Sequence, residues 1–218
     1  MILLPALLVI VMRYVLDSQV QFDHVAPSLL AIFPFIIMFL ITSVATLRER
    51  TTGTLERLMT MPISKLDLLL GYALAFGVFA VIQVTVVAVF ALTWLGFTVA
   101  GSLALLLVVA VLDALLGMAL GLFVSAFART EFQAVQFMPL LAAPQILVCG
   151  LFTPRSHMAA PLARVSDVLP LSYAVDAMKI VATSSDVSEE LIRDIAIVAG
   201  STILVLVLGA ATLRRRTP

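Results

Sequence analysis

The sequence predicts an all-α integral membrane protein with six membrane-spanning helices. Hydrophobic residues make up 62% of its 218 residues and charged residues 12%, whereas soluble proteins average about 45–50% and about 25%. Apolar stretches long enough to cross a bilayer recur along the chain, and shorter polar segments separate them. Lipid must therefore solvate much of this surface. The net charge of zero gives no reason to expect a nucleic-acid partner.

We expect one membrane domain that covers residues 1–218. A spanning helix requires about 20 mostly apolar residues. The first expected span is shorter than this, which suggests that the natural chain starts earlier, and the third is long enough to tilt. The six expected spans are, in chain order, residues 2–16, 28–47, 66–95, 101–127, 132–152 and 191–213.

The segment between the fifth and sixth spans is too polar and too rich in proline to cross a bilayer. It covers residues 153–190 and includes one amphipathic piece, residues 172–182. A helix of this kind suits the membrane surface, so we expect an extracytoplasmic interfacial segment before the sixth span.

The distribution of basic residues predicts the orientation, because cytoplasmic loops carry an excess of Lys and Arg. With six spans, eight of the thirteen basic residues fall on one side together with both termini. We therefore predict that both termini are cytoplasmic. The eight residues are Arg48, Arg50, Arg57, Lys65, Arg129, Arg214, Arg215 and Arg216.

A charged segment, LRERTTGTLERLMTMPIS at residues 47–64, lies between the second and third spans. Gly53 or Thr54 can cap a helix here, Glu56 suits its first turn, and Pro62 stops it. An apolar stripe at helical spacing consists of Leu55, Leu58 and Met59. So short a helix is marginal in water. It therefore either packs on its own membrane domain or docks against a soluble partner.

Motifs for metal, nucleotide or catalytic sites are absent from the sequence. Cys149 is the single cysteine, the two histidines are isolated, and no cluster has metal-ligand spacing. No G-x-x-x-x-G-K-[ST] motif is present, so we expect no ATP site and no other cofactor in this chain.

Three stretches together resemble the ABC-2 type transporter permeases. The first is Arg48 to Leu58 followed by Pro62, which is similar to that family's R-E-x-x-x-G-T-x-E-x-L…P signature. The second is residues 161–179, PLARVSDVLPLSYAVDAMK, and the third is residues 128–134, ARTEFQA. The chain departs from the family in lacking an amphipathic cytoplasmic helix before its first span.

This resemblance implies a transport subunit without its own ATPase activity. The segment after the second span would be a cytoplasmic coupling helix that docks into a separate ATP-binding subunit, which would bind the ATP. The implied contact residues are Arg48, Glu49, Arg50, Gly53, Thr54, Glu56, Arg57 and Leu58. A second permease copy or a paralogue would complete a dimer in the bacterial cytoplasmic membrane.

Within the family, the sequence is most similar to the antibiotic and multidrug efflux branch, which implies export of a lipophilic compound. Export of a polysaccharide or a lipid-linked glycan is the alternative within transport. An intramembrane enzyme with Asp113 as its acid–base group, or a scaffold that does not transport, are alternatives from other classes.

Asp113 lies near the middle of the fourth span, where a charge costs about 2.5–3.5 kcal/mol, so it should face protein or water rather than lipid. It could contact substrate, or it could be a hydrogen-bonded packing residue, a subunit-interface residue or a protonated acid. On the same span, Gly117, Gly121 and Ser125 predict a close helix contact. Gln83, Gln136 and Gln145 are expected to hydrogen-bond between helices rather than to contact substrate.

Overall fold

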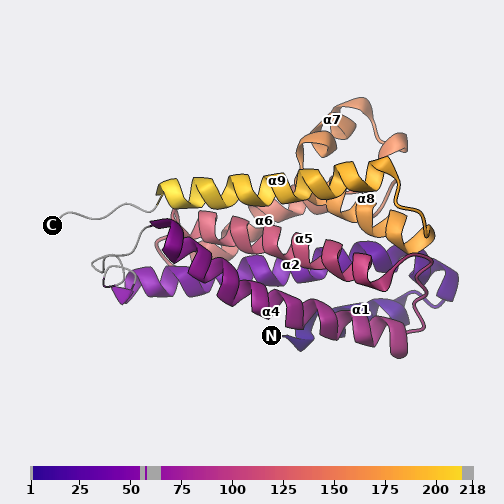
Figure 1. Cartoon of the computed structure of the whole chain (residues 1–218), viewed down its shortest axis with the longest axis horizontal. Helices are drawn as coiled ribbons and strands as arrows, with labels where there is room; N and C mark the ends of the chain where they lie inside the picture. The colour runs from indigo at the N-terminus through magenta and orange to yellow at the C-terminus, as the bar shows by residue number, and fades with distance from the viewer. Residues whose placement is uncertain (1, 55–56, 58–64, 213–218) are drawn as a thin grey trace.

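A computed structural model describes residues 2–54, 57 and 65–212, and all the regular secondary structure in these residues is helical. Figure 1 shows the helices packed as one elongated bundle. The helices are α1 (Leu3–Val15), α2 (Gln19–Thr51), α4 (Lys65–Thr93), α5 (Leu103–Ser125), α6 (Glu131–Val148), the 3-10 turn η1 (Arg155–His157), α7 (Ala160–Val168), α8 (Pro170–Thr183) and α9 (Glu189–Thr212).

Four helices of the described chain are long and apolar enough to cross a membrane: α2, α4 from Leu70 onwards, α5 and α9. They correspond to the second, third, fourth and sixth expected spans. Helices stand at the other two expected positions as well, but α1 has 13 residues and α6 has 18. At 1.5 Å per residue these are about 20 Å and about 27 Å long, against a hydrocarbon core of about 30 Å. The six-span topology therefore stays a prediction.

Helix α5 is the centre of the bundle and packs against α2, α4, α8 and α9. Its contact with α2 is close because two glycines bring the backbones together. A methyl group on Gly121 would lie 2.5 Å from the carbonyl oxygen of Phe39, and one on Gly117 would overlap the backbone of Phe35. The paired residue numbers rise together, so α2 and α5 run parallel. The predicted close contact is confirmed.

The second helix starts earlier than expected. The second span was expected at residues 28–47, but residues 19–27 also belong to α2, so its expected start was wrong. The turn around Gln19 is held by its side-chain amide, which donates to Asp23 at 3.0 Å and to the carbonyl oxygens of Leu95 and Gly96 at 3.3 Å. Phe22 is fully buried in the core. Tertiary contacts thus extend the helix beyond its apolar run.

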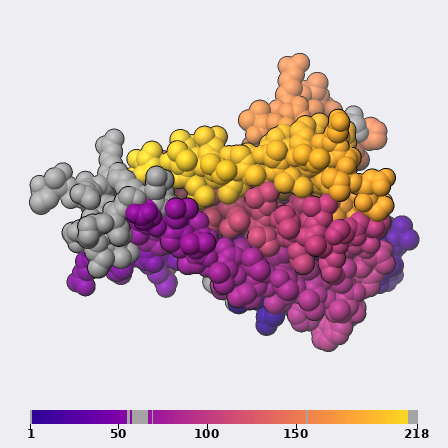
Figure 2. Space-filling model, viewed as in Figure 1, coloured from indigo at the N-terminus to yellow at the C-terminus, as the bar shows by residue number. Residues whose placement is uncertain are grey.

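The amphipathic piece at residues 172–182 is helical, as expected, and forms most of α8. Its apolar side is covered by protein, because α8 packs against α2, α5 and α9, and residues such as Val175 and Met178 are fully buried. The amphipathic pattern had suggested that this side faces the membrane surface, but it faces the other helices instead. Helix α7, in contrast, projects from the bundle beside the start of α9 (Figure 2).

Candidate functional site

The predicted contact segment begins inside α2, whose last turn includes Arg48, Glu49 and Arg50. The expected second span ended at residue 47, whereas α2 continues to Thr51, so its expected end was wrong. Successive helical residues are about 100° apart around the axis, so neighbouring side chains point to different parts of the bundle. Each of the three side chains contacts a different helix.

Arg48 forms a two-bond ion pair with Glu131, the first residue of α6. Its Nε donates to Oε1 at 2.6 Å and its Nη2 to Oε2 at 3.0 Å. The hydrogen bond from Arg48 lowers the pKa of Glu131. Both side chains are more than half exposed, at 65% and 52%. The pair therefore contributes little to stability, as is usual for surface ion pairs, but it ties the end of α2 to the start of α6.

Arg50 and Glu49 tie the same turn to α5 and α4. The Nη1 of Arg50 donates to the carbonyl oxygen of Ser125 at 2.9 Å. Ser125 is the last residue of α5, where carbonyl groups lack helical partners and attract cations. The Tyr72 hydroxyl of α4 donates to the Glu49 carboxylate. One helical turn of α2 thus holds three other helices.

Gly53 follows the end of α2 and has a left-handed backbone conformation, with φ +77°. This conformation favours glycine, and among the described residues no atom beyond its chain neighbours lies within 4 Å of the position of its missing Cβ. The Arg57 amide donates to the Gly53 carbonyl at 3.1 Å, which closes one turn that includes Thr54. Glu56 and Leu58 lie outside the described residues, so the predicted helix at 53–60 stays a prediction.

The start of α6 is built by residues of the third motif. The Thr130 hydroxyl accepts from the Gln133 amide at 3.2 Å, and the Gln133 side chain accepts from the Arg129 amide at 2.9 Å. Ala128 and Ala134 pack with Leu47 of α2 in a small apolar cluster. Sequence reasoning identified this motif but missed that Glu131 pairs with Arg48. The pair could have been expected, because Glu131 is an acid in the first turn of a helix on the predicted cytoplasmic side, where Arg48 also lies.

Asp113 lies wholly inside the bundle, as the sequence predicted for a mid-span acid. It is 0% exposed, and neither carboxylate oxygen has a hydrogen-bond partner among the described residues. It lies one helical turn from Gly117 and so belongs to the α5 face that packs on α2. Asp113 therefore lies away from the Arg48–Glu131 pair that joins α2 to α6, which we call the α2–α6 junction. The role of Asp113 stays a prediction.

Gln83 and Gln145 do not make the expected contacts. In the described chain neither polar atom of buried Gln83 has a hydrogen-bond partner, and Gln145 donates only to Leu141, within its own helix. The prediction that these two residues hydrogen-bond between helices was therefore wrong.

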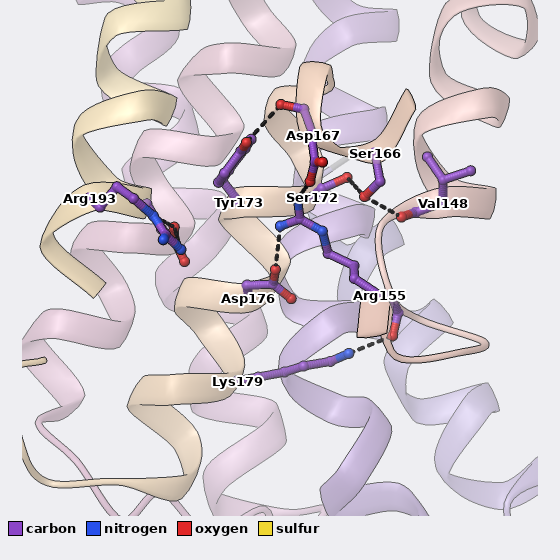
Figure 3. A network of polar contacts seen from close by, with 11 residues as sticks. Val148, Arg155, Ser166, Asp167, Ser172, Tyr173, Asp176, Lys179 and Arg193 are labelled. Carbon is purple, nitrogen blue, oxygen red and sulfur yellow. Dashed lines mark hydrogen bonds and ion pairs between the residues drawn. The ribbon is translucent and has the colours of Figure 1, made fainter. Parts of the chain in front are cut away.

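Sequence reasoning missed a second polar cluster, which Figure 3 shows from close by; its helices α7 and α8 lie at the end of the bundle away from the end of α2 (Figure 1). Arg155 donates to Asp176 of α8 at 2.7 Å and to Asp167 of α7, and its guanidinium lies 4.8 Å from the centre of the Tyr173 ring. Although burial lowers the pKa of Arg155, its bonds to the acids raise it overall. Lys179 donates to the Gly150 carbonyl at 2.5 Å.

This cluster fastens the segment after α6 to α8. The Ser166 hydroxyl of α7 bonds both the Val148 carbonyl, at 2.8 Å, and Ser172 of α8, at 3.0 Å. Six of the participating residues belong to the second motif, residues 161–179, so part of that motif maintains this polar cap. Among the described residues, no group of three or more His, Cys, Asp or Glu side chains could hold a metal ion.

Comparisons with known proteins agree with one another. The sequence model of the ABC-2 type transporter family matches residues 1–182. The probable multidrug ABC transporter permease YbhR of Escherichia coli K12 is 30% identical over 155 residues, which cover 71% of this chain and 42% of YbhR. The probable multidrug ABC transporter permease YbhS of the same strain is 26% identical over 210 residues, which cover 94% of this chain and 55% of YbhS.

A eukaryotic protein is also similar. ABC transporter G family member 20 of Dictyostelium discoideum is 27% identical over 157 residues, which cover 72% of this chain and 22% of that protein. The chain therefore spans between about a fifth and just over half of the length of these relatives.

Proposed function

The chain belongs to the ABC-2 type transporter family, and from this premise we propose that it is the membrane-spanning permease subunit of an ATP-binding cassette exporter. A separate ATP-binding subunit binds and hydrolyses the ATP. A second permease, either a copy or a paralogue, completes the translocation path. The complex works in the bacterial cytoplasmic membrane, with residues 48–65 facing the cytoplasm.

The observation that carries this proposal is the junction at the end of α2. Residues 53–60 dock into the ATP-binding subunit as a coupling helix, directly after the turn that holds α4, α5 and α6. When ATP binding moves this segment, Arg48 moves α6 and Arg50 moves α5. The movement then passes along the close backbone contact between α2 and α5 towards the opposite side of the membrane.

The transported compound is a lipophilic drug or antibiotic. Two bacterial relatives carry the name probable multidrug ABC transporter permease, which supports this choice. The described helices also leave many large apolar side chains exposed, such as Leu74 at 71% and Phe132 at 73%. Such side chains suit contact with lipid and with a compound dissolved in it, although they do not by themselves define a binding pocket.

A site-directed crosslink tests the docking claim. Cys149 is the single native cysteine, so a Cys149→Ser background allows a unique thiol at Thr54→Cys. A photoactivatable thiol probe at Thr54→Cys should capture a protein that carries a P-loop from native membranes. As a control, the same probe at Arg164→Cys, an exposed position on α7, should capture no ATP-binding protein.

Two outcomes would contradict the proposal. One is capture without any ATP-binding protein at Thr54→Cys; the other is equal capture from both positions. If docking is established, transport is tested by the minimal inhibitory concentrations of lipophilic drugs in overexpressing cells. Unchanged drug sensitivity together with altered export of a surface glycan would overturn the drug-efflux part and leave the permease part intact.

A further inference from the structure

A polar hollow of about 460 Å³ opens between α7, α8 and α9, beside the cap shown in Figure 3. This volume is in the range of small-molecule sites, but such sites are mostly apolar and this one is mostly charged. Ile197 lies among its lining residues. The other lining residues are the acids Asp167, Asp176 and Glu190, the bases Arg155 and Arg193, and Tyr173.

The hollow offers a ligand two accessible acids, Glu190 and Asp167, and one base, Arg193; although Asp167 binds Arg155, its side chain is 63% exposed. Arg155 is already engaged by Asp167 and Asp176. Glu190 is exposed, and no hydrogen bond joins it to another described side chain. Arg193 uses Nε and Nη2 to bind one oxygen of its neighbour Asp194, at 3.1 and 3.0 Å. Its second amino group, Nη1, remains available, and the side chain is 59% exposed.

The hollow lies at the depth of lipid headgroups. Helix α9 has 24 residues and is about 36 Å long, which exceeds a hydrocarbon core of about 30 Å. Its first turn, with Glu190 and Arg193, therefore lies in the headgroup layer, and Ile197 lies one turn deeper. Two turns beyond Ile197 on the same side of α9 lies Leu204, which is exposed at 59%. The polar part of a lipid fits the hollow while its acyl chains follow α9.

We propose that this hollow binds a zwitterionic phospholipid whose headgroup carries a primary amine. The ammonium donates to the carboxylates of Glu190 and Asp167, which flank the hollow from α9 and α7. The phosphate accepts from the guanidinium of Arg193. A primary amine fits better than a quaternary one, because only the primary amine has N–H groups to donate.

Native mass spectrometry of the purified protein tests the proposal. The protein is equilibrated with equal amounts of phosphatidylethanolamine, phosphatidylcholine and phosphatidylglycerol that have identical acyl chains. Phosphatidylethanolamine should remain bound preferentially during gentle delipidation. Glu190→Gln and Arg193→Gln should each weaken its retention about tenfold, since each removes one charge-assisted contact.

The chain offers matched controls. Glu189 and Arg164 are exposed charged residues beside the hollow that do not line it, so Glu189→Gln and Arg164→Gln should leave retention unchanged. Because Glu190, Glu189 and Arg164 are exposed, their variants should keep the thermal midpoint of the parent protein, whereas Arg193→Gln also removes the partner of buried Asp194 and should lower it. A photoactivatable phosphatidylethanolamine should label peptides from residues 187–197 in the parent and lose this labelling in the two hollow variants.

Three results would overturn the proposal. Equal retention of phosphatidylcholine would show that the amine is not recognised, and preferred retention of phosphatidylglycerol would show an anion site instead. Equal losses in the control variants would reduce the effect to overall surface charge. None of these readouts depends on transport or on the ATP-binding subunit, so they do not affect the proposed function.

Discussion

Gly117 shows how one missing side chain controls the packing of two long helices. Any Cβ at this position would overlap the backbone of Phe35, which cannot move aside as a side chain can. We expect Gly117→Val to separate α2 from α5 and to destabilise the protein by about 3 kcal/mol, the upper part of the usual range for overpacking, because the neighbour is rigid backbone. The measurement is the thermal midpoint of the purified protein in detergent, together with the yield of folded protein.

Gly200 provides a control for this substitution. It lies in α9 and is exposed, and no atom from another part of the described chain lies within 4 Å of its missing Cβ. Gly200→Val should therefore leave stability nearly unchanged. If both variants lost stability equally, the general cost of valine in a helix, and not the α2–α5 contact, would account for the effect.

Asp113 provides the opposite case, a polar side chain in the core without a partner among the described residues. Burying such a group costs about 1–3 kcal/mol. We expect Asp113→Leu, which replaces it by an apolar side chain of similar size, to stabilise the fold by about this amount. Chemical denaturation in mixed micelles measures the change. A loss of stability would reveal that the carboxyl group makes a contact that supports the fold.

Single residues differed in how well the sequence predicted their surroundings. The glycine spacing predicted a close contact correctly, because the four-residue period and the absent side chains are properties of one helix. The predicted bonds of Gln83 and Gln145 were wrong, because an interhelical bond also requires an acceptor on another helix at the right rotation. Composition carries no information about that rotation.

At the scale of elements, the Arg48–Glu131 pair links the ends of α2 and α6. We expect Arg48→Glu and Glu131→Arg, made singly, to leave the thermal midpoint nearly unchanged, because the pair is exposed. Each single variant should nevertheless reduce transport-coupled ATPase activity severalfold. The double variant, which restores the opposite charges, should recover much of that activity. Equal losses in the single and double variants would contradict a linking role for this pair.

The same pair predicts a pH dependence. Arg48 lowers the pKa of Glu131, so the favourable interaction is present above the ordinary carboxyl pKa and is lost as the pH falls through the lowered value. Spin labels on α2 and α6 should therefore report a closed junction at neutral pH and a looser one below about pH 4. In Glu131→Gln the distance should be independent of pH over this range. A pH-dependent distance in that variant would assign the titration to another group.

Arg155 links three segments of the opposite cap through its two acids and the Tyr173 ring. Lysine has no planar guanidinium, so it cannot donate to both acids while it stacks on the Tyr173 ring. Arg155→Lys should therefore loosen the segment from Gly150 to Ala159. Hydrogen–deuterium exchange should rise at least tenfold there and remain unchanged in α5. As a control, Arg164→Lys on the exposed side of α7 should leave exchange unchanged in both regions.

The boundaries of the helices were less predictable than their existence. The apolar run indicated a span at residues 28–47, yet α2 starts at Gln19 and continues to Thr51. Both extensions are polar, and both are held by contacts with distant parts of the chain, Gln19 with Leu95 and Arg48 with Glu131. Hydropathy reports the apolar centre of such a helix, whereas tertiary contacts determine its ends.

At the scale of the whole molecule, the order and type of the helices followed from the apolar pattern. The polar cap did not, because its residues are scattered from Gly150 to Lys179 and meet only through the path of the loop after α6. Figure 1 places the end of α2, the start of α4 and the end of α9 at one end of the bundle, and α7 with the start of α9 at the other. This arrangement agrees with the predicted separation of basic residues between the two sides.

The crossing of the membrane by α6 decides between the six-span topology and alternatives with fewer spans. Helix α6 is about 27 Å long and shorter than a typical crossing, but it connects the two ends of the bundle. We expect it to cross, so that residues before and after it lie on opposite sides. In a Cys149→Ser background, the single-cysteine variants Arg129→Cys and Arg164→Cys should differ in whether a membrane-impermeant maleimide labels them in intact cells. Arg164→Cys should be labelled, and Arg129→Cys only after permeabilisation.

A third position makes this experiment independent of the absolute orientation. Thr54 lies next to the junction that Arg48 and Glu131 close, so Thr54→Cys must behave as Arg129→Cys does, whichever side they face. Agreement of Thr54 with Arg129 and disagreement with Arg164 would establish that α6 crosses the bilayer. If all three thiols reacted from the same side, α6 would be a helix that enters the membrane and does not cross it. The polar cap around Arg155 and the proposed coupling helix at residues 53–60 would then lie on the same side of the membrane. A movement of residues 53–60 could not be transmitted across the membrane to that cap.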